Sequence, residues 1–241
     1  MRNRRSKFLV RRILLGTAIL LVVIASGLYA IGKSNQTATQ KALTSTIVPR
    51  TTTTTAVPAT TTTVDPGTLP QTSVFPSTNS RQFITKIADL WNAITTGNPT
   101  LALPSFFPES AYVSLKTITN PASDYQTRLL GAFKLDILAA HSYLGANAST
   151  AQFIGIAVPS WSANWVTPGN CYSNTGYWHV GDSRLLYRVG NSTYSIGIAS
   201  LISWRGQWYV VHMGSVASTG ASGIVNNPAP GVGVFGYAGV C

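Results

Sequence analysis

Hydrophobic residues are concentrated in two parts of the chain, of which the first is a single unbroken run. Residues 13–31 read ILLGTAILLVVIASGLYAI and contain no charged side chain. At 1.5 Å per residue such a helix is about 28 Å long, close to the roughly 30 Å hydrocarbon core of a bilayer. The pattern therefore predicts a transmembrane helix over residues 13–32, which would contact membrane lipid directly.

The charges on either side of this run predict its orientation. Residues 1–12 carry six Arg and Lys side chains, whereas Lys33 alone follows closely behind the run. The positive-inside rule then keeps residues 1–12 in the cytoplasm and places the rest of the chain outside the cell membrane, on a single-pass signal-anchor. A cleaved signal peptide, ending near Leu28-Tyr29-Ala30, is the alternative, and it leads to the same extracytoplasmic location.

Residues 33–80 have a different composition, dominated by Thr, Ser and Pro. Such a stretch has too little apolar surface to offset the chain entropy lost on folding. We expect a disordered linker over residues 33–80, which would hold a folded domain away from the membrane.

From residue 81 the hydrophobic positions recur every three or four residues, which is typical of amphipathic helices. Ser80 and Gly97 are suited to the two ends of a helix over residues 81–96. A second long helix is expected from Asp124 to Leu144. The predicted inward positions of the two helices are Phe83, Ile84, Ile87, Leu90, Trp91 and Ile94, then Leu130, Phe133, Ile137, His141 and Leu144.

After Gly145 the hydrophobic period changes from 3.6 to 2, which indicates β-strands. Strands are expected at residues 152–159, 177–180, 184–189, 192–204 and 207–213, with turns at Gly181-Asp182, Gly190-Asn191 and Arg205-Gly206. Short turns make successive strands antiparallel. We therefore predict an α+β domain over residues 81–215, with N-terminal helices packed on a curved antiparallel sheet. A two-residue turn at Arg205-Gly206 would pair Trp204 with Gln207, Leu201 with Val210 and Ala199 with His212.

This order of helices and strands, together with the ending SLISWRGQWYVVHMG, resembles the nuclear-transport-factor-two-like superfamily of cone-shaped α+β domains. With its predicted membrane anchor and Thr/Pro-rich stalk, the chain also resembles uncharacterised envelope proteins of actinobacteria. The resemblance implies a cavity between the helices and the sheet, in which enzymes of the superfamily often use a His or Asp as acid or base. It makes His141, His212 and Trp208 candidates for a ligand pocket, while a structural role in the core is the alternative for each histidine.

Net charge excludes one class of function. The chain carries 17 basic and 6 acidic residues, a net charge of +11, but six of the cations lie in residues 1–12. Residues 81–241 carry eight basic and five acidic side chains, without a basic cluster. Nucleic-acid binding requires such a cluster, so we expect no nucleic-acid partner. The spacing of the His and Cys residues fits no metal motif, and no cofactor motif is present, so neither a metal nor a cofactor is expected.

Aromatic residues crowd the segment between residues 161 and 178. Trp161, Trp165 and Trp178 could stack on sugars or grip a protein partner if they are exposed, or close a small core if they are buried. Binding to a cell-wall glycan would need at least two of these rings exposed and coplanar.

Two cysteines, Cys171 and Cys241, lie in the part expected to be exported. In an oxidising compartment such a pair favours a disulfide. The bridge would close a loop of about 70 residues, worth roughly 4 kcal/mol in the chain-entropy treatment. It would pin a Gly-rich tail, residues 216–241, to the domain; an intermolecular link through Cys241 is the alternative.

No nucleophile motif, carboxylate pair or phosphate loop points to a reaction. The sequence therefore favours a non-catalytic binding or accessory module of the cell envelope, whose partner is an envelope protein or a cell-wall polymer. A small-ligand-binding or enzymatic domain that uses a pocket histidine, and a glycan-binding module, are the two alternatives.

Overall fold

The computed structural model describes residues 64–217 and 221–236, which belong to one compact unit. The expected transmembrane helix at residues 13–32, the cytoplasmic segment and the linker up to residue 63 lie outside the described residues. Across the described ranges, no helix is both long and apolar enough to cross a bilayer.

The first long helix, α2, spans Arg81–Thr96 as predicted. The Ser80 hydroxyl accepts a hydrogen bond from the Phe83 amide, and Gly97 ends the helix in the left-handed conformation with φ of 65°. One inward position was wrong. Ile84 is 51% exposed, whereas Lys86 is only 8% exposed and occupies the inner face of the helix.

Two short helical segments follow, a 3-10 helix at Pro99–Ser105 and α3 at Glu109–Leu115. The second long helix starts three residues earlier than expected, at α4, Pro121–Asp124, because the Asn120 side chain accepts a hydrogen bond from the Ser123 amide. A π-helical turn, Tyr125–Leu129, then leads into α5, Leu130–Leu144. Short 3-10 turns also occur at Pro66–Thr68, Gly145–Ser149, Ser160–Ser162 and Asn170–Tyr172.

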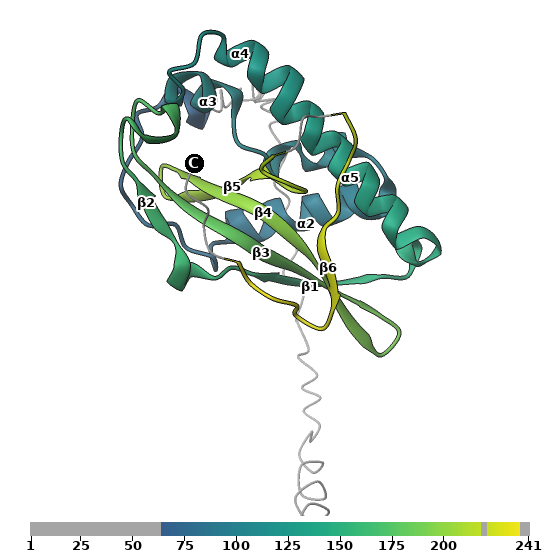
Figure 1. Ribbon diagram of the computed structural model, residues 1–241. Helices are drawn as coiled ribbons and strands as arrows, with labels where there is room; N and C mark the ends of the chain where they lie inside the picture. Colours follow the sequence, from purple (N-terminus) through teal and green to yellow (C-terminus); the bar gives the residue numbers. More distant parts are fainter. Residues whose placement is uncertain (1–63, 218–220, 237–241) are drawn as a thin grey trace, which may run out of the picture. The chain divides into compact units, whose positions relative to one another are not determined.

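The α+β prediction is confirmed: the helices precede and pack against a six-stranded antiparallel sheet (Figure 1). Its strands are β1 Gln152–Ala157, β2 Asn164–Val166, β3 Tyr177–Val189, β4 Ser192–Trp204, β5 Gln207–His212 and β6 Asn226–Pro230. The two long strands, β3 and β4, form the centre. Strands β1 and β2 pair with different parts of β3, and β5 and β6 pair with different parts of β4.

The expected turn at Gly181-Asp182 is instead a kink within the single strand β3. Asp182 has φ of 44°, and its carboxylate accepts a hydrogen bond from the Asn226 side chain. The β-ladder to β4 continues on both sides of it. These turn-forming residues therefore produce a bend rather than a turn, because β3 remains paired with the same strand, β4, before and after them.

The hairpin between β4 and β5 follows the predicted register at its turn but not at its far end. Trp204 pairs with Gln207 and Leu201 with Val210, as expected. The pairing shifts between Ser200 and Leu201, so that His212 pairs with Ser200 rather than with Ala199. A bulge of this kind re-aims the side chains beyond it, and here it redirects His212.

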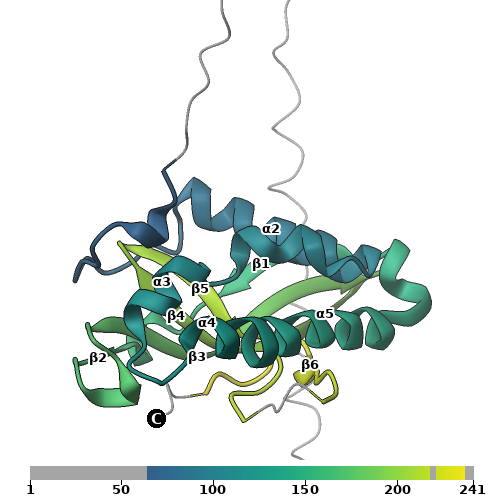
Figure 2. The same cartoon turned by 90° about the horizontal axis from the view of Figure 1, so that it is seen from above.

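Helices α2 and α5 pack against each other and against β5, and α2 also contacts β1 (Figure 2). Aromatic rings join these layers: Trp91 of α2 stacks on Phe153 and Tyr187 of the sheet, and Phe133 of α5 stacks on Phe106. Burial of these large rings contributes to the hydrophobic stabilisation of the domain. The largest fully buried side chains are Trp204, Trp208, Arg184, Tyr112, Phe83, Phe107, Phe133, Ile87, Leu90, Ile94, Leu115 and Ile137.

Residues 64–80, expected to be part of the disordered linker, are packed along the domain. The indole of Trp204 donates a hydrogen bond to the Pro66 carbonyl at 2.9 Å, and that of Trp178 donates to the Ser73 carbonyl at 3.0 Å. Phe75 makes edge-to-face contacts with Trp178 and Trp208. Three tryptophans of the sheet thus hold this segment, and the folded domain begins before residue 80.

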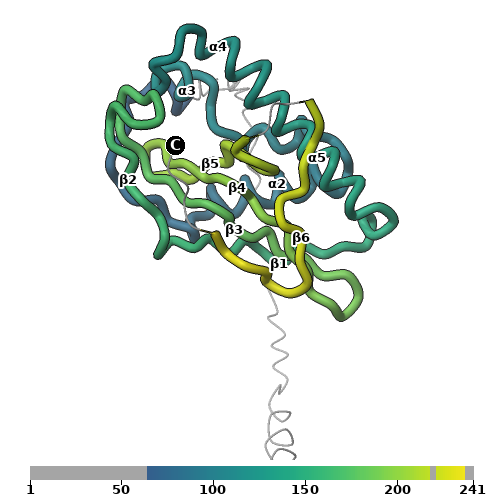
Figure 3. The backbone as a smooth tube through the Cα atoms, viewed as in Figure 1, coloured from purple at the N-terminus to yellow at the C-terminus, as the bar shows by residue number. Residues whose placement is uncertain are grey.

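The Gly-rich tail contributes a strand that the sequence did not predict. β6 runs back alongside β4 (Figure 3). The buried guanidinium of Arg184 donates hydrogen bonds to the carbonyls of Asn227 and Val232 in this segment. Asp136 of α5 is buried and accepts hydrogen bonds from the amides of Gly214 and Ile224. These polar contacts therefore hold residues 224–232 against the rest of the domain.

Candidate functional site

A cavity of about 340 Å³ lies between α3, the π-helical turn and the sheet. Its walls come from several segments that are far apart in the sequence. The lining residues are Tyr112, Leu115, Lys116, Arg128, Leu129, Cys171, Tyr177, His179, Ala199, Ser200, Ile202, Val211, His212 and Val216. The cavity therefore combines an apolar wall with a small number of polar groups, as small-molecule sites commonly do.

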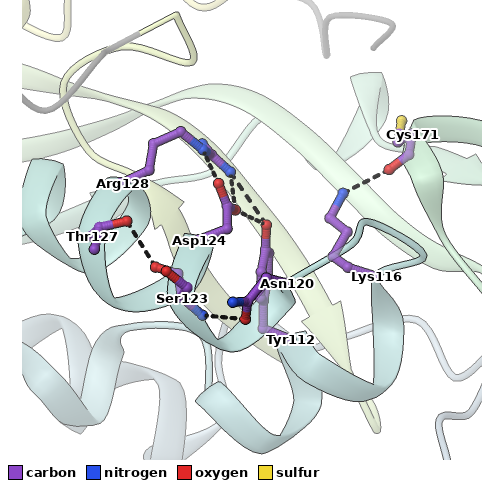
Figure 4. Close-up of polar contacts among 8 residues, drawn as sticks. All are labelled: Tyr112, Lys116, Asn120, Ser123, Asp124, Thr127, Arg128 and Cys171. Carbon is purple, nitrogen blue, oxygen red and sulfur yellow. Dashed lines mark hydrogen bonds and ion pairs between the residues drawn. The ribbon is translucent and has the colours of Figure 1, made fainter.

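Tyr112 and Arg128 form one polar part of the wall, and both bind Asp124, which does not itself line the cavity (Figure 4). The Arg128 guanidinium donates to both oxygens of Asp124, at 2.7 and 2.6 Å, and the Tyr112 hydroxyl donates to the same carboxylate at 2.5 Å. The hydrogen bond from Arg128 lowers the pKa of Asp124. Burial, followed by the hydrogen bond to Asp124, raises the pKa of Tyr112 well above its ordinary value. Asp124 and Arg128 therefore form a fixed ion pair, and Tyr112 beside them stays protonated.

Lys116 places a second cation beside this cluster. Its ammonium group donates a hydrogen bond of 2.7 Å to the carbonyl of Cys171 and lies 5.9 Å from the centre of the Tyr112 ring. Burial lowers the pKa of Lys116, and the positive charge of Arg128 acts in the same direction. With Arg128 and Lys116 against Asp124, the wall has one positive charge in excess while Lys116 is protonated.

His212 reaches the cavity because of the bulge in the β4–β5 hairpin. Burial, with smaller contributions from Arg128, His179 and Lys116, lowers the pKa of His212 to about 4, and the charge of Asp124 opposes them. His212 is therefore neutral at physiological pH and can donate or accept one hydrogen bond without bringing a charge. His179, beside it, has its Nε2 atom 2.9 Å from the Ser200 hydroxyl.

We expect His212 to make the protein sensitive to mild acid. The unfolded chain protonates a histidine near pH 6.5, but the folded protein only near pH 4, so the unfolded state binds more protons between these values. Stability should fall as the pH drops through this window, by about 2 kcal/mol from pH 7 to pH 5 for this group alone.

Urea unfolding of the wild type and of His212→Gln at pH 7 and pH 5 measures this contribution. The variant should lose less unfolding free energy between the two pH values than the wild type, by about 2 kcal/mol. Equal losses in the two proteins would contradict the assignment.

His141, the other predicted pocket histidine, does not line the cavity. It projects from α5 towards the end of α2, where its Nδ1 atom donates a hydrogen bond of 2.8 Å to the Ile94 carbonyl. Its ring also contacts the glycine that ends α2, Gly97. His141 therefore has the structural role that was the alternative to a pocket residue, because it connects the two long helices.

Trp208 does not line the cavity either. It is completely buried on the other face of β5, where Phe75 packs edge-to-face against it. The expected pairing of Ala199 with His212 would have placed Trp208 and His212 on one sheet face. It was wrong because β5 has one extra residue opposite the step from Leu201 to Ser200, which moves His212 to the other face.

The three tryptophans proposed for glycan or partner binding do not form one flat surface. Trp161 is 70% exposed, whereas Trp165 and Trp178 are half-buried. The rings of Trp165 and Trp178 meet edge-to-face at 66°, and the indole N–H of Trp178 is bonded to Ser73. This pair lacks the coplanar arrangement that stacking on a sugar requires, and instead closes the core over residues 73–75.

Cys171 lines the cavity in a strained backbone conformation, with φ of 53°, followed by Tyr172 with φ of 52°. Cys241, its predicted partner, lies outside the described residues. The disulfide between them stays a prediction.

Sequence reasoning found His212 but missed the residues around it: Tyr112, Lys116, Asp124, Arg128 and His179. One signal was available, because Asp124 and Arg128 stand four residues apart, a spacing that favours an ion pair on a helix. The other residues come from separate segments, and only the fold brings them to one cavity. Among residues 64–217 and 221–236, no group of three or more His, Cys, Asp or Glu side chains could hold a metal ion.

No family model matches this chain, and neither does any curated protein or solved structure. The fold is described by its own architecture, an α+β domain with helices packed against a six-stranded antiparallel sheet.

Proposed function

We propose that this protein is a membrane-anchored, extracytoplasmic binding module of the cell envelope, built on a cone-shaped domain of the nuclear-transport-factor-two-like kind. Its ligand would be a small amphipathic molecule with an anionic head, held in the His212 cavity. The observation that carries the proposal is the lining of that cavity, which joins an apolar wall to Arg128 and Lys116.

The apolar wall favours a hydrocarbon body in the ligand. Leu115, Leu129, Ile202 and Val211 are buried and line the cavity together. Each buried CH₂ group of a ligand gains about 0.8 kcal/mol when it leaves water for such a surface. A cavity of about 340 Å³ lies within the range of small-molecule sites.

The polar wall favours a negative charge at one end of the ligand. The Arg128 side chain is 39% exposed, so its guanidinium can bind a further acceptor while it stays paired with Asp124. Guanidinium groups bind carboxylates and phosphates in a planar, directional way. Neutral His212 adds one hydrogen bond without adding charge.

The same polar groups make binding a better interpretation than acid–base catalysis. A histidine with a pKa of about 4 is a weak base at neutral pH. Asp124 is held in its ionised form by Arg128, and Tyr112 in its protonated form. His212, Asp124 and Tyr112 are therefore not poised to exchange a proton near pH 7, which supports the non-catalytic role.

An NMR titration of the 241-residue chain tests the binding proposal. Decanoate, below its micelle concentration, should shift the amide signals of Arg128, Lys116 and Val211, and uncharged decanol should bind several-fold more weakly. Arg128→Met should weaken decanoate binding about tenfold, equal to 1.4 kcal/mol. Ala199→Phe should weaken both ligands because its ring would fill the cavity.

Lys134→Met is the matched control, because Lys134 is an exposed cation on α5 outside the cavity. It should leave both affinities unchanged. Signals that move only elsewhere, or affinities that Arg128→Met and Ala199→Phe both leave unchanged, would refute the proposed site.

The proposed location is tested separately, with protease added to intact cells. Cleavage of the chain beyond residue 33 in unbroken cells supports the extracytoplasmic placement. Protection of the whole domain until the cells are lysed would reverse the topology.

A further inference from the structure

Lys86 is a buried lysine of α2 on the inner face of that helix, and only 8% of its surface is exposed. Its ammonium group lies 3.4 Å from the centre of the Tyr209 ring. The Nζ atom is buried and has no hydrogen-bond partner among the described residues. A lysine nitrogen can donate three hydrogen bonds, and leaving them unmade in a buried place is costly.

A second cavity, of about 420 Å³, adjoins this side chain. It is separate from the His212 cavity, since the two share no lining residue. Most of its wall is apolar or aromatic, including Phe106, Tyr125 and Leu130. Lysine has four side-chain torsions, so rotation about the terminal bonds can turn its amine from the Tyr209 ring towards this space.

The charges around the cavity restrict what it can hold. Asp65 and Glu109 also line it, and their carboxylates disfavour an anionic ligand. Burial lowers the pKa of Lys86 to about 8, so that a large fraction of the amine is neutral at slightly alkaline pH. A neutral amine in an apolar cavity is a nucleophile for carbonyl groups.

We propose that the cavity beside Lys86 is a second small-molecule site, which takes an uncharged aldehyde or ketone and binds it to the Lys86 amine as an imine. The nitrogen lone pair attacks the carbonyl carbon, and a proton moves from nitrogen to oxygen to give a carbinolamine. This adduct then loses its hydroxyl group as water, so that amine and carbonyl give imine and water without any redox change. The reaction is reversible and needs no further reactant.

Reductive trapping on the 241-residue wild type tests the proposal. Benzaldehyde and sodium cyanoborohydride convert an imine into a stable benzyl-lysine, which peptide mass spectrometry assigns to a residue. At pH 8 we expect Lys86 to be labelled several-fold faster than Lys134, an exposed lysine of α5. Lys116, which is half-buried and donates to the Cys171 carbonyl, provides a second comparison.

The pH dependence separates a reactive amine from a merely accessible one. Labelling of Lys86 should level off above about pH 8, whereas labelling of the lysine in a short unstructured peptide, with a pKa near 10.4, should continue to rise to higher pH. Labelling of Lys86 that is no faster than that of Lys134 at pH 8, or that rises in parallel with labelling of the peptide, would overturn the proposal.

A charged analogue tests the part played by Asp65 and Glu109. 4-Carboxybenzaldehyde has the same ring with an added carboxylate. Relative to Lys134 in the same sample, Lys86 should be labelled several-fold less by this compound than by benzaldehyde. Equal or stronger relative labelling by the anion would refute an uncharged ligand for this site.

Discussion

Replacement of Arg184 by alanine is expected to lower the free energy of unfolding by about 3 kcal/mol or more. This arginine is fully buried in β3 and donates to the Ser195 hydroxyl at 2.7 Å and to the carbonyls of Val232 and Asn227 at 3.0 and 2.7 Å. Hydrogen bonds from a charged donor contribute about 1.5–3 kcal/mol each, and the loss of the long side chain adds a cavity. Denaturant unfolding measures the loss.

Arg188→Ala is the matched control, because Arg188 lies four residues further along β3 with its side chain exposed. Its single described hydrogen bond, to Gln152, measures 3.2 Å, and surface changes of this kind usually stay within about 0.5 kcal/mol. Arg184→Ala should also speed hydrogen exchange at the Gly231 amide, which is bonded to Thr193 in the native protein. Similar losses in the two variants would mean that Arg184 does not hold the tail.

A chain that begins at Arg81 should be less stable than one that begins at Val64, by about 3 kcal/mol. The shorter chain lacks Phe75, the partner of Trp178 and Trp208, and the carbonyls that accept from Trp178 and Trp204. Lost apolar burial and lost hydrogen bonds both contribute. Denaturant unfolding gives the difference, and tryptophan emission should move to longer wavelength in the shorter chain because its indoles meet water.

A third chain, Phe75→Ala starting at Val64, separates the two contributions. It keeps the backbone acceptors and loses only the ring, so its stability should lie between those of the other two chains. If the chains starting at Val64 and Arg81 unfold at the same denaturant concentration, residues 64–80 contribute nothing to the fold.

Local signals in the sequence were sufficient for the first long helix and for the class of fold. Ser80 and Gly97 determine the two ends of α2 through capping, which depends only on neighbouring residues. The exchange of Ile84 and Lys86 between the outer and inner faces was not predictable from hydrophobicity, because the Tyr209 ring that covers Lys86 is contributed by a distant strand.

Features that depend on a partner strand were predicted less well. The bulge at Ser200 follows from how β5 fits beside β4, and the kink at Asp182 from its contact with Asn226. The strand β6 contains Pro228 and Pro230, and proline argues against a strand except at the edge of a sheet. β6 is such an edge strand, because it pairs only with β4. The prediction of the site was affected in the same way, because the bulge places His212 in the cavity and on the opposite sheet face from Trp208.

The edge strands of the sheet affect how readily the domain associates with itself at high local concentration. An open strand margin invites pairing with another chain. Here β5 is bridged by Phe106 to the segment before α3, β6 carries two prolines that lack an amide proton, and β1 is interrupted by a bulge between Phe153 and Gly155. Many copies crowded together at one surface should therefore resist amyloid-like self-association, even though the domain is rich in β-forming residues.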